Sequence, residues 1–270
     1  MKYKILSLIS FILIISCTDD STALVPEVDL LTVWAYVYAD EQLDDIKLTS
    51  TIALDSELEE APLVSGANVV VSTDSGSFTC IEDTSNPGNY YYPGTDFEVS
   101  TGDQVELTVT TEDETVYAIS SVPPKPIDVS INTNTMTLPV FTDRESMREW
   151  RENAEDVEIT WIAESGAWYY VVLENVDSNP QAIDTMFPER LQRRIFPPIQ
   201  DNHYRINFPI FTHTGLHLLT VYRVNQEYVD LYEYREQDSR DLQEPLTNIE
   251  GGLGIFSAFN SDNVTLNVTY

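Results

Sequence analysis

Hydrophobic and polar residues alternate along most of the first half of the chain. Residues 31–38 (LTVWAYVY) place aliphatic side chains on one face and three aromatic side chains, Trp34, Tyr36 and Tyr38, on the other. Residues 46–54 (IKLTSTIAL) likewise place Ile and Leu on one face and Lys and Thr on the other. A period of two that is rich in β-branched and aromatic residues predicts β-strands.

Further short strands follow, and turn signals such as Asn86-Pro87-Gly88 separate them. The same pattern predicts strands at residues 67–72, 77–81, 89–92, 104–111 and 115–120. Short strands at this spacing favour a β-sandwich. We therefore expect residues 28–122 to form one β-sandwich domain, with Cys80 buried inside it as a small apolar residue.

The clearest boundary is the stretch VPPKP at residues 122–126. Its prolines cannot donate to a strand ladder and they stiffen the chain, so we place a linker at residues 123–127. The remainder, residues 128–270, is expected to be a second β domain with short helices near residues 143–156 and 226–237. The predicted fold is thus mainly β, with two β-sandwich-type domains.

The end of the chain continues the alternating pattern. Two separate closing strands are predicted, at residues 254–259 (GIFSAF) and 264–270 (VTLNVTY). Gly251, Gly252 and Gly254 come before the first of these strands and not before a helix, so they do not form a phosphate-binding loop. We expect them to be structural, with Gly252 at a positive φ and Phe256 packed on the second domain.

The N-terminus has the form of a secretory signal, with two lysines in residues 1–4 and an apolar run that ends at residue 15. The run is shorter than the roughly 20 residues that a transmembrane helix needs. Ile-Ile-Ser before Cys17 resembles a bacterial lipobox, which predicts a signal peptide at residues 1–16 and acylation of Cys17. Residues 17–27 would then be a tether.

Two acids, Asp19 and Asp20, follow this cysteine almost at once. They resemble the acidic surface-export signal of Bacteroidota lipoproteins, which implies an outer-membrane location facing the cell exterior. The alternatives are a solvated tether and a location on the periplasmic face.

The composition and net charge of the chain limit which partners and cofactors it can bind. The chain has 270 residues and a net charge of −31, which repels nucleic acid, so no nucleic-acid partner is expected. It has two cysteines; with Cys17 acylated, Cys80 has no partner for an internal disulfide. The acidic loops lack an Asp-x-Asp-x-Asp-Gly pattern, so calcium binding stays a minor alternative and no cofactor is expected.

No catalytic motif stands out. There is no Gly-x-Ser-x-Gly elbow and no phosphate loop. His213 and His217 have the spacing of zinc ligands on a helix, but the run after them alternates like a strand, where residues four apart lie about 13 Å apart. No metal site is therefore expected. A hydrolase that uses two carboxylates is a weaker alternative to a non-enzymatic protein.

Candidate contacts with a partner or ligand lie in the second half. Arg190, Arg193 and Arg194 form a basic cluster in an acidic chain, and they could meet a partner, meet lipid headgroups or pair with nearby acids. Trp168 could belong to a carbohydrate platform or to the core. Alternation places Trp168 and Tyr170 on one face of their strand and the residue between them on the other.

Several stretches resemble a large family of Bacteroidota lipoproteins known only as a domain of unknown function. They are "PLVSGANVVVSTDSG", "NPGNYYY" and "STGDQVELTVTTEDETVYAISSVPPKPID", with a closing signature around "NIEGGLGIF". The signature contains Asn248, Gly251, Gly252, Gly254 and Phe256. The first half also resembles transthyretin-like modules.

This resemblance implies an accessory role beside a TonB-dependent β-barrel transporter. The alternative is a surface lipoprotein that binds glycan or peptide on its own.

Overall fold

The computed structural model describes residues 30–52, 58, 60–139, 143–183, 193–207, 210–236 and 247–270. The predictions about the signal peptide, Cys17, Asp19, Asp20 and Arg190 lie outside these residues. No helix in the described part of the chain is long and apolar enough to cross a membrane.

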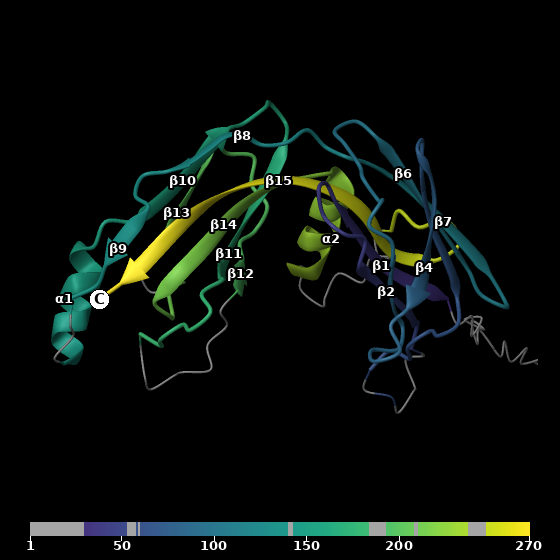
Figure 1. Cartoon of the computed structure of the whole chain (residues 1–270), viewed down its shortest axis with the longest axis horizontal. Helices are drawn as coiled ribbons and strands as arrows, with labels where there is room; N and C mark the ends of the chain where they lie inside the picture. Colours follow the sequence, from purple (N-terminus) through teal and green to yellow (C-terminus); the bar gives the residue numbers. More distant parts are fainter. Residues whose placement is uncertain are drawn as a thin grey trace, which may run out of the picture.

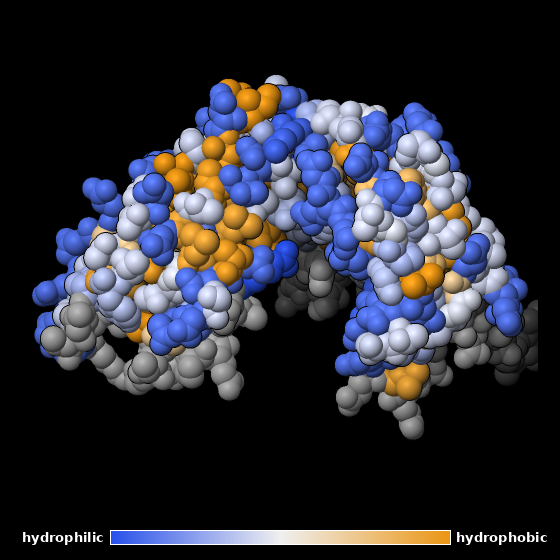
Figure 2. Space-filling view, viewed as in Figure 1, coloured by the Kyte–Doolittle hydropathy of each residue, from blue (hydrophilic) through white to orange (hydrophobic). Residues whose placement is uncertain are grey.

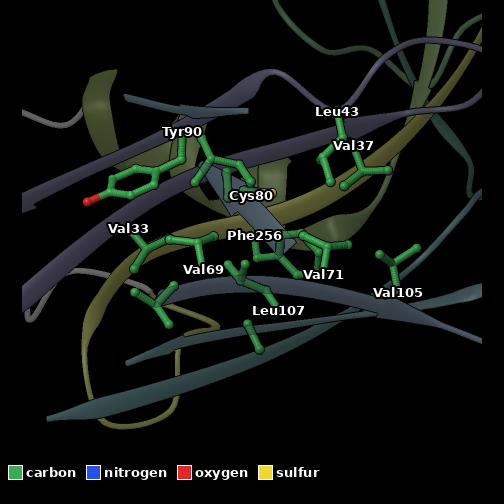
Figure 3. Close-up of a cluster of buried hydrophobic side chains, with 14 of the residues drawn as sticks. Val33, Val37, Leu43, Val69, Val71, Cys80, Tyr90, Val105, Leu107 and Phe256 are labelled. Atoms are coloured by element: carbon green, nitrogen blue, oxygen red, sulfur yellow. The ribbon is translucent and has the colours of Figure 1, made fainter. Parts of the chain in front are cut away.

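The first half forms a sandwich of short strands, as the alternating pattern predicts. Its strands are β1 (Leu31–Tyr38), β2 (Asp45–Ser50), β3 (Asn68–Thr73), β4 (Gly76–Glu82), β5 (Asn89–Tyr91), β6 (Gln104–Thr110) and β7 (Thr115–Ser121). They are joined in the order β1-β2-β5-β4-β3-β6-β7, and β4 connects the two layers. Figure 3 shows the side chains packed between these layers, with Cys80 among them.

The second half extends the same hydrogen-bonded sheet and adds a separate three-stranded one. Its strands are β8 (Ile127–Ile131), β9 (Thr135–Thr137), β10 (Val157–Ile162), β11 (Trp168–Asn175), β12 (Arg193–Ile195), β13 (His203–Ile206), β14 (Gly215–Val224) and β15 (Leu253–Thr269). The extension has the order β12-β11-β14-β15 and continues into β1, with β9 beside β15, and the separate sheet has the order β13-β10-β8. A second core, which contains Trp161 and Tyr169, packs against both sheets. The chain is therefore mainly β, with two sandwich-type halves.

Two short helices complete the fold. Helix α1 (Arg144–Asn153) begins at a capping box, in which the Asp143 side chain accepts from the Ser146 N–H and the Ser146 side chain accepts from the Asp143 N–H. Helix α2 (Gln226–Glu236) follows β14. Figure 1 shows the molecule as an arch, with α2 beneath β15 and between the two halves.

The closing strand joins the two halves. The prediction of two separate strands at its position is wrong, because β15 runs without a break through all 17 of its residues. Its first part, up to Phe259, pairs in parallel with β1, and its second part, from Asn260, pairs antiparallel with β14. The polar residues 260–263 resemble a turn in the sequence, but β14 supplies them with a full ladder partner.

Phe256 therefore packs in the first core and not on the second domain, which corrects a second prediction. It is fully buried together with Val33, Leu107 and Ala258, as Figure 3 shows for the labelled members of that cluster. The physical reason is the parallel pairing with β1, which carries the start of β15 into the first sandwich.

Candidate functional site

A stripe of two aromatic side chains on β1, Tyr36 and Tyr38, forms one side of the site. Because alternate residues of a strand face opposite sides, Tyr36 and Tyr38 point away from the first core, which Val33 and Val37 enter. Tyr38 stacks on Phe259 of β15, with ring centroids 5.0 Å apart and an interplanar angle of 21°. The stripe thus faces the point where β15 passes from one sandwich to the other.

The second half and helix α2 supply the facing aromatic rings. Tyr170 of β11 stacks on Tyr222 of β14 at 4.8 Å, and Tyr228 of α2 stacks on Tyr170 at 5.3 Å. Tyr36 meets Tyr228 edge to face at 6.4 Å. Such ring pairs contribute about 0.5–1.5 kcal/mol each beyond the area that they bury. The aromatic cluster therefore holds the two sandwiches and α2 in one arrangement.

A partly buried polar network fastens α2 to the first sandwich at the same junction. The Ser120 hydroxyl of β7 donates to Glu227 Oε1 at 2.7 Å and accepts from the Ala258 N–H at 3.0 Å. Ser257 also donates to Glu227 Oε1, at 3.1 Å, and the Asn225 side chain donates to the Ser121 carbonyl at 2.8 Å. A buried polar group without a hydrogen bond destabilises the fold, so this network favours one position of α2 against the first sandwich.

A pocket of about 250 Å³ lies beside the aromatic cluster. Its wall contains Tyr36, Tyr38, Tyr170, Tyr228, Asp45 and Arg193. These residues come from β1, β2, β11, β12 and α2, so both halves of the molecule contribute to one site. Figure 2, in the same view as Figure 1, shows the hollow that the two halves enclose beneath β15.

The tyrosine hydroxyls of this region stay protonated at neutral pH. Burial, with a smaller effect from Glu41, raises the pKa of Tyr222 to about 12. Burial also raises the pKa values of Tyr38 and Tyr170, and the neighbouring tyrosines add to both shifts. The pocket wall therefore offers neutral phenols, which can donate hydrogen bonds and present aromatic faces.

Acidic groups surround the one guanidinium of the pocket. Partial loss of hydration, and then the charge of Asp44, raise the pKa values of Asp45 and Glu41, while Arg193 acts in the opposite direction on both. Arg193 also forms an ion pair with Glu174, with 3.9 Å between Nε and Oε2. Both side chains are about half exposed, so the pair itself adds little stability.

The predicted contact residues divide between two environments. Trp168 and Arg193 both reach the aromatic site: Trp168 packs against its cluster and donates from Nε1 to Gln226 Oε1 at 3.2 Å. Arg194 is the next residue on the exposed strand β12, so its side chain faces the other way. Trp161 and Tyr169 belong to the second core.

The glycines of the closing signature serve the packing of β15. Gly254 has φ +104°, and an added Cβ would lie 1.9 Å from the Val33 carbonyl oxygen of β1. Gly252 does not have a positive φ, so that prediction is wrong; its role is close approach, because a Cβ would lie 2.7 Å from the Leu31 oxygen. Gly251 has φ +82°.

Asn248 acts as a strand partner for the start of β15. Its Oδ1 accepts from the Phe256 N–H at 2.9 Å, and its Nδ2 donates to the Phe256 carbonyl at 2.6 Å. The closing signature therefore fixes the start of β15 to the first sandwich.

His217 is occupied within the fold. Its Nδ1 lies 3.0 Å from the Gly215 carbonyl oxygen, which requires a proton on Nδ1, and its Nε2 accepts from Asn175 Nδ2 at 3.2 Å. Burial lowers the pKa of His217, which favours this neutral form. His213 lies before β14 and contacts the Thr212 hydroxyl through Nδ1 at 2.9 Å. In the described residues, no three His, Cys, Asp or Glu side chains gather as a metal site.

A family model described as "Domain of unknown function (DUF4249)" matches residues 18–265, which is nearly the whole chain. The chain belongs to this family. No curated protein matches it. Among solved structures, the chain is similar to the FN1–FN3 domains of chicken CNTN1, at 11% identity and a TM-score of 0.25, over 89% of this chain and 67% of that one.

The sequence pointed to part of this site only. Tyr228 and Asp45 were not singled out, because their closeness depends on pairings between distant strands. The available signal was the aromatic stripe of Tyr36 and Tyr38 on the polar face of an otherwise ordinary strand. Aromatic side chains on a face that a sandwich does not bury indicate that another part of the molecule, or a ligand, covers that face.

Proposed function

We propose that this member of the DUF4249 family is a non-enzymatic binding protein, anchored by lipid on Cys17 to the outer membrane of a Bacteroidota cell. In this proposal it faces the cell exterior and serves as an accessory partner of a TonB-dependent transporter. The observation that carries the binding role is the tyrosine-lined pocket to which both sandwiches and α2 contribute. A site that is already assembled binds without first ordering its own side chains.

The sequence before the fold supports the anchoring. An apolar run ends at Ile15, Ser16 and Cys17 follow, and two acids come directly after the next residue. Each buried CH₂ of an acyl chain contributes about 0.8 kcal/mol, so two or more chains on one cysteine hold a protein stably at a membrane. The described fold begins at Leu30, which leaves a short stretch of chain between lipid and sandwich.

Purification from native membranes tests this role. The tagged protein is solubilised in mild detergent, and the proteins that accompany it are identified by mass spectrometry. A co-purifying β-barrel transporter, absent from an untagged control, supports the accessory role. Recovery of the protein alone contradicts that role.

The second candidate is a surface lipoprotein that binds glycan or peptide by itself. The observation that favours it is the position of Trp168 beside the tyrosine cluster, because aromatic rings supply large, rigid contact faces. In the purification experiment this candidate predicts no barrel, together with retention of the protein on a glycan or peptide array.

The anchoring can be tested by one substitution. Cys17→Ala should move the protein from the membrane fraction to the soluble fraction without changing its circular dichroism, because lipid and fold are separate. Metabolic labelling with palmitate should label the wild type and not the variant. The matched control is Cys80→Ala: the Cys80 thiol is buried and its pKa is raised to about 12, so this variant should remain labelled and anchored. A wild type without label would rule out the lipoprotein.

A further inference from the structure

The pocket beside the aromatic cluster already contains a cationic group of the chain itself. Arg193 lies in its wall, and the charge of this guanidinium acts on Asp45, on Glu41 and on the phenols of Tyr170 and Tyr222. The same wall carries tyrosines and the Asp45 carboxylate. This is the combination that binds cations, because aromatic faces and carboxylates both attract positive charge.

One guanidinium does not balance the acids of this region. Glu41 and Asp44 lie between β1 and β2, Asp45 begins β2, and Glu174 lies beside Arg193. Burial is the main cause of the raised pKa values of Asp45 and Glu41, and Arg193, whose ion pair is with Glu174, offsets them only in part. The net charge of −31 adds to the negative potential. A further cation would therefore be attracted to this site, whereas an anion would be repelled.

Only weak interactions hold Arg193 in its place. It begins β12, a three-residue strand at the end of its sheet, and all three residues of β12 are exposed. Its ion pair with Glu174 is long, at 3.9 Å, and half exposed. An exposed pair of this kind contributes about 0–1 kcal/mol, so a competing cation can replace Arg193 at small cost.

The size of the pocket restricts the ligand. A volume of about 250 Å³ lies below the roughly 300–1,000 Å³ that is usual for sites of drug-sized molecules. It suits one long side chain or a small organic cation. The pocket opens at the junction of two sandwiches, where a longer chain can lie across the rim.

We propose that this pocket binds an arginine or lysine side chain of a peptide or protein segment, and that Arg193 occupies the site in the absence of that segment. This inference rests on the proposed binding function and names the chemistry of its ligand. It assigns Asp45 and the tyrosines to ligand contact. It also makes Arg193 a competitor of the ligand and not its receptor.

Titration calorimetry on the full-length protein in detergent tests the proposal. The probes are three blocked tripeptides, Gly-Arg-Gly, Gly-Lys-Gly and Gly-Glu-Gly, together with methylguanidinium. We expect the two basic peptides to bind and the acidic one not to bind. Stronger binding of the arginine peptide than of methylguanidinium would identify a peptide ligand, whereas equal binding would overturn the peptide part of the proposal in favour of a free organic cation.

Two substitutions should change the affinity for the arginine peptide in opposite directions. Asp45→Asn should weaken binding of the arginine peptide by about tenfold, since it removes one charged contact. Arg193→Gln should strengthen it by about three- to tenfold, because the internal competitor is gone. Glu112→Gln is the matched control: Glu112 is an exposed acid between β6 and β7, outside the pocket wall, and its replacement changes the net charge equally but should not change the affinity.

If Asp45→Asn fails to fold, the exposed neighbour Asp44→Asn replaces it, with an expected loss of about two- to threefold. Weaker binding in Arg193→Gln would overturn the proposal, because Arg193 would then help to bind the peptide and would not compete with it. So would the absence of basic-peptide binding in both the wild type and Arg193→Gln at about 10 mM peptide. A co-purifying barrel together with failed titrations would leave the accessory role standing and remove only the cation site.

Discussion

Gly254→Ala is expected to lower the free energy of unfolding by roughly 2–5 kcal/mol. Two costs add. The backbone has φ +104°, where a Cβ is strained, and that Cβ would lie 1.9 Å from the Val33 carbonyl oxygen, which is backbone and cannot turn aside. The strands β15 and β1 would have to separate at the residue pair Val33 and Gly254. Urea unfolding followed by circular dichroism measures the loss.

A second glycine separates the two costs. Gly102 has a similar φ of +90°, but nothing lies within 4 Å of the Cβ that alanine would add. Gly102→Ala should therefore cost only the backbone strain, about 1–2 kcal/mol. If both variants lose the same free energy of unfolding, the close approach of β15 to β1 does not contribute to stability, which would contradict the packing of Gly254 against Val33.

Phe256→Ala is expected to cost about 3–5 kcal/mol, which is a large share of the roughly 5–15 kcal/mol that stabilises a domain. The ring is fully buried in the first core, and its removal leaves a cavity among side chains of the opposite layer, such as Leu107. The melting temperature of the purified protein measures the effect. Ile119→Ala, at a side chain that is 43% exposed, serves as the control and should change it little.

Hydrogen exchange then locates the damage from Phe256→Ala. Because Phe256 belongs to the first core, protection should fall first in β3 and β6 and less in β10. Loss of protection confined to β10 and β13 would contradict this placement. Phe256 would then pack on the second domain, as the sequence pattern predicts.

The alternating pattern was sufficient for most elements of the fold. Period-two runs predicted the strands of the first sandwich, and both helices were predicted near their observed limits, α1 at Arg144–Asn153 and α2 at Gln226–Glu236. These elements follow local rules: side-chain alternation, turn residues and helical spacing. The two sandwich-type halves follow from the spacing of the strands.

What the sequence could not supply depends on distant pairings. Residues 260–263 are polar and resemble a turn, yet β14 pairs with them and makes β15 continuous. Gly251, Gly252 and Gly254 look alike in the sequence, yet only the first and third have a positive φ. Gly252 and Gly254 approach β1, whereas Gly251 lies against Thr115 of β7. The pocket likewise requires β1, β11, β12 and α2 to meet, and no local pattern encodes that meeting.

The proposed cation-binding pocket requires the two sandwiches to unfold as one unit. A calorimetric melt of the full-length protein, with and without the arginine peptide, tests it most directly. We expect one cooperative transition that moves upward as a whole when peptide is added, by an amount equivalent to about 2.7 kcal/mol at a concentration 100 times the dissociation constant. Two separate transitions, or a transition that the peptide leaves in place, would contradict it.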